Sequence, residues 1–402
     1  MSADGLHIFL VAGEESGDRL GGALMEALKQ RCGGRVRFSG VGGAQMSAQG
    51  LTSLFPLGEL AIIGFATIPM SLPRILRRIR ETADAAVAAK PDVMVIIDSP
   101  EFTHRVARRV RQHAPAIPIV DYVCPSVWAW RPGRAKAMRG FIDHVLALLP
   151  FEPAALWKLD GPPSTYVGHP LSERAAALRP NAAEAARRLA NPPLLLVLPG
   201  SRAGEITRLS NVFGQAVALV RERIGELEVV VPTVPYLANL VRRCIDEWDV
   251  PARIVIDPAE KDAAFRTARA ALTKSGTSTL ELAVAGVPMV AGYKIPLIEE
   301  LVGHLMVKVP SIILANLVLG EKAVPEVLQR SCTPDELAKA LLPVISDAPE
   351  RRRQIEAFGR LDAIMEIGSA APSDRAAAAV LECAGHVNHT GRETVALPSI
   401  TA

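Results

Sequence analysis

Short apolar runs of strand length alternate with amphipathic segments along most of this chain. In the first half Leu6–Ala12 and Val93–Ile97 are almost wholly apolar, and in the second half Leu194–Leu198 and Ala270–Thr273 repeat the pattern. Continuous apolar runs are typical of parallel strands buried on both faces, and a helix between successive strands lets them run parallel. The pattern predicts an α/β fold with two Rossmann-like, doubly wound sheets, one in each half, that face a cleft.

The alternation stops near the middle of the chain and again towards its end. Residues 172–193 are rich in Ala, Arg and Pro, so we expect a linker between a first domain at 1–171 and a second at 194–345. Residues 346–384 have only helical patterns, and the polar stretch 385–402 is expected to be frayed. The sequence therefore predicts two α/β domains followed by a helical segment.

A glycine turn follows the apolar run Ala270–Thr273 and opens an amphipathic segment. Gly276 would let the backbone approach a ligand, and the free N–H groups of the first helical turn would bind anionic oxygens. Glu281, one turn further on, is suited to accepting hydrogen bonds from ribose hydroxyls. The hydroxyl side chains that would assist are Thr277, Ser278 and Thr279. The spacing from Ser278 to Glu281 is equally that of a capping box, which needs no ligand, so both interpretations stay open.

Charged side chains also follow other predicted strands. Arg202 stands on a glycine turn after Leu194–Leu198 and suits a diphosphate, because a guanidinium bonds phosphate oxygens in pairs; an exposed turn arginine is the alternative. Asp98 directly follows Val93–Ile97. Ligands of open parallel sheets bind at this edge, so a carboxylate there is well placed for chemistry, although Asp98 could equally cap the next helix.

One stretch is unlike the rest, because no charged residue occurs between Glu59 and Arg74 and an arginine cluster follows. Its large apolar residues are Ile62, Ile63, Phe65, Ile68, Met70 and Leu72. A core helix with a solvated basic face would have this pattern, and so would a surface that dips into an anionic bilayer. The sequence leaves both interpretations open.

Composition narrows the class of protein. A formal charge of +3 over 402 residues gives no reason to expect wholesale nucleic-acid binding. The five cysteines have no paired spacing, which suits a reducing cytosol and excludes the usual zinc motifs. No apolar run approaches the ~20 residues of a spanning helix, and Met1–Gly5 is too short for a signal peptide. We expect a cytosolic protein that can still touch a membrane.

Several longer motifs occur along the chain. They are Ala12–Asp18, Pro125–Arg131, Pro199–Arg202, Ser275–Glu281 and Asn316–Gln329. On these motifs the chain resembles, from Leu6 to about Cys383, the lipid-A-disaccharide synthase family of inverting glycosyltransferases with the GT-B fold. Several long motifs in order are more specific than any one alone. One departure is Ala315, where the family usually has proline; without it the turn that presents Asn316 is less rigid.

The resemblance implies a reaction between UDP-2,3-diacylglucosamine and 2,3-diacylglucosamine 1-phosphate (lipid X), which yields a β-1,6-linked disaccharide 1-phosphate and UDP. Inversion at the anomeric carbon needs a base on the acceptor side, for which Asp98 is the candidate and Glu15, in the first loop, its nearest competitor. Trp128 and the apolar stretch would bind the acceptor and its acyl chains. The implied UDP-sugar ligands are Ser201, Arg202, Ser275, Gly276, Thr277, Ser278, Thr279, Glu281, Asn316 and Gln329.

The resemblance also implies a peripheral protein of the cytoplasmic surface of the inner membrane, with no cofactor, no metal and no nucleic-acid partner. The helices of 346–384 would pack back on the first domain, and a homodimer is left open. The alternatives are a UDP-sugar 2-epimerase and another GT-B UDP-N-acetylglucosamine transferase with a lipid acceptor. The uncharged stretch Leu60–Leu72 speaks against the epimerase, which handles only soluble sugars.

Overall fold

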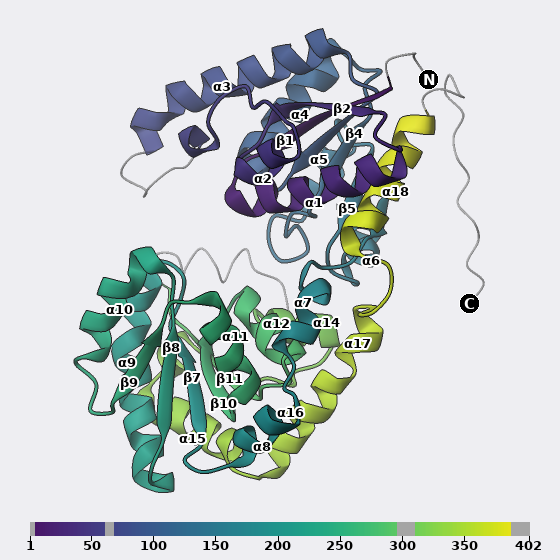
Figure 1. Ribbon diagram of the computed structural model, residues 1–402. Helices are drawn as coiled ribbons and strands as arrows, with labels where there is room; N and C mark the ends of the chain where they lie inside the picture. Colours follow the sequence, from purple (N-terminus) through teal and green to yellow (C-terminus); the bar gives the residue numbers. More distant parts are fainter. Residues whose placement is uncertain (1–4, 61–67, 296–309, 387–402) are drawn as a thin grey trace. The chain divides into compact units, whose positions relative to one another are not determined.

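The chain forms two compact α/β units, and in each a parallel sheet is covered by helices on both faces (Figure 1). Unit 1 comprises Met1–Pro170 with Ala370–Ala402, and unit 2 comprises Leu171–Ser369. The residues that the computed structural model describes are 5–60, 68–295 and 310–386. The predicted fold class, two Rossmann-like α/β domains, is confirmed.

The sheet of unit 1 has six parallel strands in the order β2-β1-β3-β4-β5-β6. They are β1 (Leu6–Ala12), β2 (Val36–Val41), β3 (Val93–Ile97), β4 (Ile119–Tyr122), β5 (His144–Ala147) and β6 (Ser164–Tyr166). Since β1 pairs with β2 on one side and with β3 on the other, the winding of the chain reverses at β1. Loops that leave the sheet at such a reversal diverge, and ligands bind in the crevice outside the carboxyl ends of the strands.

Helices cover both faces of this sheet. They are α1 (Glu15–Arg31), α2 (Ala44–Ala48), η1 (Leu57–Leu60), α3 (Ile68–Ala89), α4 (Pro100–His113), α5 (Gly133–Met138), α6 (Glu152–Lys158) and α18 (Pro372–His386). Phe9 and Val11 of β1 belong to the core under α3 and α4, whereas Ile8 and Leu10 belong to the core under α1 and α18. Both sides of the strand are therefore buried, which is why its sequence is apolar throughout rather than alternating. Among the described helices, none is both long and apolar enough to cross a bilayer.

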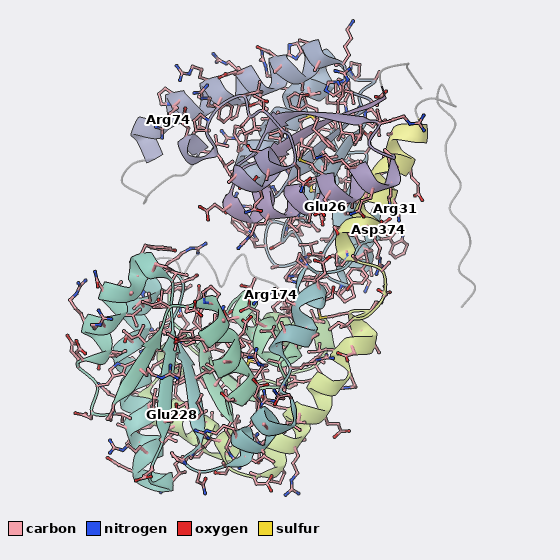
Figure 2. The ribbon with its side chains drawn as sticks, in the orientation of Figure 1. Glu26, Arg31, Arg74, Arg174, Glu228 and Asp374 are labelled. Carbon is pink, nitrogen blue, oxygen red and sulfur yellow. The ribbon has the colours of Figure 1, made fainter. Side chains whose placement is uncertain are left out.

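The last described helix, α18, brings the chain back to unit 1, where it packs on α1. Ala376 and Val380 are fully buried in this contact. The guanidinium of Arg31 on α1 bonds both carboxylate oxygens of Asp374, at 2.6 and 2.7 Å (Figure 2). Because this pair is exposed, it orients the helix more than it stabilises it.

The sheet of unit 2 has the strand order β12-β11-β10-β7-β8-β9, again all parallel. Its strands are β7 (Leu194–Leu198), β8 (Glu228–Pro232), β9 (Ala252–Val255), β10 (Ala270–Lys274), β11 (Met289–Tyr293) and β12 (Glu326–Leu328). The helices are α7 (Leu171–Leu178), α8 (Ala182–Leu189), α9 (Ala203–Ile224), η3 (Pro235–Leu237), α10 (Ala238–Ile245), α11 (Pro258–Thr267), α12 (Thr277–Val284), α14 (Leu314–Leu319), η4 (Gln329–Ser331), α15 (Pro334–Ile345), α16 (Pro349–Gly359) and α17 (Leu361–Ile364).

The stretches 172–193 and 346–384, which have no strand pattern, are assigned to the two units by the helices on which they pack. The expected linker at 172–193 forms α7 and α8, and both helices pack on α11 of unit 2. Arg188 of α8 donates to the carbonyl oxygens of Phe265 and Gly286, each at 3.0 Å, and burial lowers its pKa to about 10. In the stretch 346–384, α16 and α17 belong to unit 2, and only α18 lies in unit 1. The return to unit 1 thus takes a single helix.

Candidate functional site

Asp98 stands at the carboxyl edge of the unit 1 sheet, directly after β3. Asp98 and the next residue, Ser99, have φ angles of 56° and 46°, a conformation that costs about 1–3 kcal/mol for a residue other than glycine. The backbone N–H of Asp98 donates to Tyr122 O at 3.1 Å, and the Thr103 hydroxyl donates to Asp98 O at 2.7 Å. These bonds hold the strained backbone, and such strain is concentrated at functional sites.

Both oxygens of the Asp98 carboxylate are oriented by hydrogen bonds. Oδ1 accepts from the backbone N–H of Ser99 at 2.7 Å, and Oδ2 accepts from the Ser16 hydroxyl at 3.1 Å. Ser99, not Asp98, is the N-cap residue of α4, so the hypothesis that Asp98 caps this helix is wrong. Each carboxylate oxygen has more than one lone-pair site, so the half-buried group has room for a further hydrogen bond.

A pocket of about 1070 Å³ lies at the same edge of unit 1. Its wall includes Glu15 and the rest of the loop after β1, the turn at Gly43, and Ser99 at the start of α4. Gly13 is needed for this close approach, since a Cβ there would lie 2.4 Å from the Ser99 Cβ. Glu15 is exposed and precedes the serine that bonds Asp98. The two base candidates therefore lie at one end of the sheet.

Trp128, in the loop after β4, is held by a buried carboxylate. Its Nε1–H donates to Glu152 Oε1 at 3.2 Å, and its ring meets Phe151 edge to face at 5.0 Å. Glu152 Oε2 accepts from the backbone N–H groups of Leu148 and Leu149, at 3.1 and 2.9 Å. The role of Glu152 could not be predicted from the sequence, because a glutamate at a helix start has no local signal that it will be buried.

We expect Glu152→Gln to flatten the dependence of stability on pH. Burial raises the pKa of Glu152 from 4.5 to about 7, although hydrogen bonds from Leu149, Trp128 and Leu148 oppose the shift. Between these two pH values the folded state keeps a proton that the unfolded state has lost, so stability falls as pH rises through the window. The fall is on the order of 3 kcal/mol. Urea unfolding on either side of the window should show it in the wild type; an equal fall in the variant would contradict the assignment.

The residues predicted to contact lipid lie at a border of the described structure. Ile62, Ile63 and Phe65 fall outside the described residues. Ile68, Met70 and Leu72 belong to the first turns of α3, but their side chains also lie outside what is described. Lipid contact by this stretch stays a prediction.

In unit 2, Glu205 ties together the ends of β7 and β10. Its Oε1 accepts from Lys274 Nζ, and its Oε2 from the backbone N–H of Ser201, each at 3.0 Å. Burial alone would raise the pKa of Glu205, but the hydrogen bond and charge of Lys274, together with the Ser201 N–H, outweigh it and leave the pKa lowered. The two loops predicted to bind the nucleotide thus meet at one ionised carboxylate, whose role the local sequence does not reveal.

Arg202 is the N-cap residue of α9, and its side chain is 84% exposed. Its guanidinium lies 3.9 Å from Glu205 Oε1, too far for a hydrogen bond, so it is available to an anion. Ser201 is exposed beside it, and its carbonyl oxygen accepts from the Tyr236 hydroxyl at 3.4 Å. Both predicted ligands of this loop therefore face solvent at the sheet edge.

The turn after β10 was predicted either to bind an anionic ligand or to contain a capping box formed by Ser278 and Glu281. Helix α12 begins at Thr277, and Gly276, with a φ of 154°, is its N-cap residue. Ser278 is therefore the second helical residue and cannot cap the helix. The capping-box hypothesis for Ser278 and Glu281 is wrong.

The four hydroxyls of this turn divide into two kinds. Thr279 Oγ1 donates to the carbonyl oxygen of the N-cap residue at 2.7 Å, and Ser275 Oγ donates to Ile312 O at 2.6 Å. These two bonds hold the turn in place. Thr277 is exposed and Ser278 half-buried, and neither hydroxyl bonds a residue in the described part of the chain. Thr277 and Ser278 are the hydroxyls available to a ligand.

Glu281 lies between two cations on neighbouring helices. Its Oε1 is 3.8 Å from Arg174 Nη1 of α7, labelled in Figure 2, and its Oε2 is 3.5 Å from Lys261 Nζ of α11. Arg174 is closer to Asp262, at 2.9 Å. Both contacts of Glu281 are longer than good hydrogen bonds, so its oxygens can still accept hydrogen bonds from a ligand.

Asn316 and Gln329 differ in what their side chains do. Asn316, 2% exposed, donates to Val324 O and to Glu326, and accepts from the Val324 N–H at 2.8 Å, so its amide closes its own loop. Gln329 has a φ of 52°, and its Oε1 accepts from the Ile295 N–H at 2.8 Å. Its Nε2 is buried and has no partner among the residues described. The Nε2 of Gln329 is therefore better suited to bind a ligand than the amide of Asn316.

A family model described as lipid-A-disaccharide synthetase matches residues 8–379. The chain belongs to this family. A curated member from Nitrobacter hamburgensis, named lipid-A-disaccharide synthase, is 58% identical over 375 residues, which cover 93% of this chain and 95% of the relative. The predicted resemblance is confirmed, and as a member of this family the chain is a glycosyltransferase.

Solved structures of other proteins share its fold. The UDP-GlcNAc 2-epimerase from Neisseria meningitidis, bound to UDP-GlcNAc, aligns with a TM-score of 0.60 at 13% identity and covers 94% of this chain and 100% of its own. MurG from Acinetobacter baumannii aligns with a TM-score of 0.53 at 15% identity, over 96% and 100% of the two chains. At such identities the likeness concerns the fold alone, so the family membership, not these neighbours, decides against the epimerase alternative.

Proposed function

We propose that this chain transfers 2,3-diacylglucosamine from its UDP derivative to the 6-hydroxyl of 2,3-diacylglucosamine 1-phosphate. The bond between the anomeric carbon and the diphosphate breaks, a β-1,6 glycosidic bond forms, UDP leaves, and the hydroxyl proton passes to a base. The observation that carries the proposal is the 58% identity, over 93% of the chain, to a relative named lipid-A-disaccharide synthase.

In this proposal unit 1 takes the acceptor, and Asp98 is the base. Its carboxylate is oriented by Ser99 and Ser16, and it follows β3, which pairs with β1, the strand at which the winding reverses. A positioned base of this kind contributes about 10²–10⁴ to the rate. The pocket beside it, with Glu15 at one side, offers room for the sugar and the start of its acyl chains. Trp128, fixed by Glu152, would add a flat apolar surface for the acceptor.

Unit 2 would take the UDP-sugar. Arg202 is suited to the diphosphate because it is exposed and makes no close ion pair with a described residue. The N–H groups of the first turn of α12 and the hydroxyls of Thr277 and Ser278 would bind the remaining phosphate oxygens. Glu281 would accept from ribose hydroxyls, and Nε2 of Gln329, which has no partner within the described part of the chain, would donate to the ligand. Ser275, Thr279 and Asn316 would act by holding the backbone that presents these groups.

The test is to incubate the purified protein with both diacylated substrates in detergent micelles. We expect UDP and the disaccharide 1-phosphate to form in equal amounts. Release of UDP without disaccharide would mean hydrolysis of the donor, and conversion of the UDP-sugar to its C2 epimer would mean an epimerase. Either result would overturn the proposal.

We also propose that the protein binds the cytoplasmic surface of the inner membrane through the stretch that leads into α3. Both substrates carry acyl chains, so the enzyme must meet them at a bilayer. Arg74 (Figure 2), Arg77 and Arg80 are exposed along α3, where they can attract anionic lipid headgroups. Leu76, between them, is 38% exposed, which adds an apolar side chain to this surface.

Replacing Ile68 and Met70 together by Ser is expected to weaken binding to anionic vesicles and to leave the melting temperature unchanged. Each large apolar side chain withdrawn from water contributes ~1.5–3 kcal/mol. Ile79→Ser is the matched control on the same helix: Ile79 is 6% exposed, so this change should lower the melting temperature without a specific loss of vesicle binding. A marked fall in melting temperature for the double variant would show that its side chains belong to the core.

A further inference from the structure

Two arginines in the wall of the unit 1 pocket pair with no carboxylate of the described residues. Arg19 lies on α1, one turn after Glu15, and Arg105 lies on α4; both side chains are exposed. Other arginines of unit 1 do have such partners, for example Arg31 with Asp374 at 2.6 Å. The two guanidiniums at the pocket therefore carry charges that no close ion pair within the described structure offsets.

The acidic residues of the pocket do not replace those partners. Asp18 is 5% exposed and accepts from three backbone N–H groups of the turn at 43–46, at 2.7, 2.9 and 3.1 Å. Glu101 is paired with Arg134 at 3.2 Å. The other two carboxylates, at positions 14 and 15, stand exposed at the start of α1. The described carboxylates of the pocket are thus either bonded to other groups or exposed to solvent, and none of them forms a close ion pair with Arg19 or Arg105.

Another part of the same pocket is apolar. Leu57 and Leu60 of η1 and Ile75 of α3 line it and are half-buried, and Phe102 of α4 is buried beneath them. A pocket of about 1070 Å³ with guanidiniums and an apolar wall matches an amphiphile that has a compact anionic group and an acyl chain. Arginine suits a phosphate monoester in particular, because its planar donors match two phosphate oxygens at once.

We propose that Arg19 and Arg105 bind the 1-phosphate of the acceptor and so determine that the acceptor is a sugar phosphate rather than a neutral glycolipid. The inference rests on the proposed function, which supplies the acceptor. Because C1, which carries the phosphate, and C5, which carries the 6-hydroxymethyl group, both adjoin the ring oxygen, an anchor at the phosphate limits the directions in which the 6-hydroxyl can point. This restraint helps to select the hydroxyl that is offered to the base.

The experiment compares two acceptors, 2,3-diacylglucosamine 1-phosphate and the same sugar without its phosphate, with Arg19→Gln and Arg105→Gln. For each variant we expect the KM for the phosphorylated acceptor to rise roughly ten- to a hundredfold, the loss of one charge-assisted interaction. The KM for the dephosphorylated acceptor and for the UDP-sugar should stay unchanged. Arg108→Gln is the matched control: it removes the same charge from α4 less than one turn away, where Arg108 covers Phe141 instead of the pocket.

If both variants keep the wild-type preference for the phosphorylated acceptor, the two arginines do not bind its phosphate, although the proposed glycosyl transfer still takes place. If the wild type forms no disaccharide from either acceptor, the proposed function fails, and titration of 2,3-diacylglucosamine 1-phosphate in micelles then decides the inference by itself. Weaker binding to both variants than to Arg108→Gln would support it, whereas no binding to the wild type, or equal binding to all, would overturn it. Melting temperatures show that each variant is folded.

Discussion

Asp98→Asn is expected to keep the fold and the affinity for the UDP-sugar and to lose roughly 10²–10⁴ in kcat. An amide cannot take the proton of the acceptor hydroxyl, which is the role proposed for the carboxylate. The substitution is mild in other respects, because asparagine tolerates the positive φ of this position better than most residues. Its carbonyl oxygen can also accept from the Ser99 N–H as Oδ1 does. Steady-state kinetics with both substrates and a thermal melt are the measurements.

Asp92→Asn is the matched control, since Asp92 precedes the same strand at its other end and accepts from the His7 N–H. It should leave kcat unchanged. Near-normal turnover by Asp98→Asn would mean that Asp98 is not the base. Glu15 would then be the candidate, and Glu15→Gln would test it. A large fall in melting temperature for Asp98→Asn would instead mean that the carboxylate chiefly holds the strained turn at Ser99.

Glu281→Gln is expected to raise the KM for the UDP-sugar roughly ten- to a hundredfold, because a charge-assisted hydrogen bond to ribose contributes ~1.5–3 kcal/mol. Stability should change by less than about 1 kcal/mol, since the contacts with Arg174 and Lys261, at 3.8 and 3.5 Å, are loose and partly exposed. Calorimetry with UDP and with inorganic diphosphate, which has no ribose, separates the ribose contact from the phosphate contacts. The variant should bind UDP more weakly and inorganic diphosphate as the wild type does.

Arg174→Gln is the control for this prediction. It removes one of the two cations at Glu281 but leaves the carboxylate in place, so UDP affinity should change little. If the melting temperature of Glu281→Gln falls and the variant binds UDP normally, the role of Glu281 is to hold α12 against α7 and α11. Ribose would then be bound elsewhere.

The strands and the residues directly after them could be predicted from local sequence. Val93–Ile97 and Leu194–Leu198 are strands with those bounds. The mostly apolar run Ile117–Val123 also predicts a strand, but only Ile119–Tyr122 forms one, and Val123 follows it with a φ of 96°. A residue that follows a parallel strand lies at the carboxyl edge of the sheet wherever the strand sits in the order. Asp98, Arg202 and Gly276 could therefore be placed from the sequence alone.

Contacts between distant segments could not be predicted in this way. Ser16 and Asp98 are 82 residues apart, Lys274 and Glu205 are 69 apart, and Trp128 and Glu152 are 24 apart. Nothing in the local sequence of either partner marks the pairing, because the two polar groups are brought together only when the sheets have formed. Glu152 and Glu205 were missed for this reason.

The local pattern of residues was enough to predict two α/β units, their strands and the polar residues at the sheet edges, because apolar runs must be buried on both faces and polar residues follow them. The residue at which each helix begins depends on the folded chain: Ser99 rather than Asp98 is the N-cap residue of α4, and Gly276 rather than Ser278 is that of α12. The folded chain also assigns α7, α8, α16 and α17 to unit 2 and α18 to unit 1. The physical reason is that helix starts and helix partners depend on which neighbouring segment satisfies each backbone and apolar group, and that neighbour is supplied by the fold.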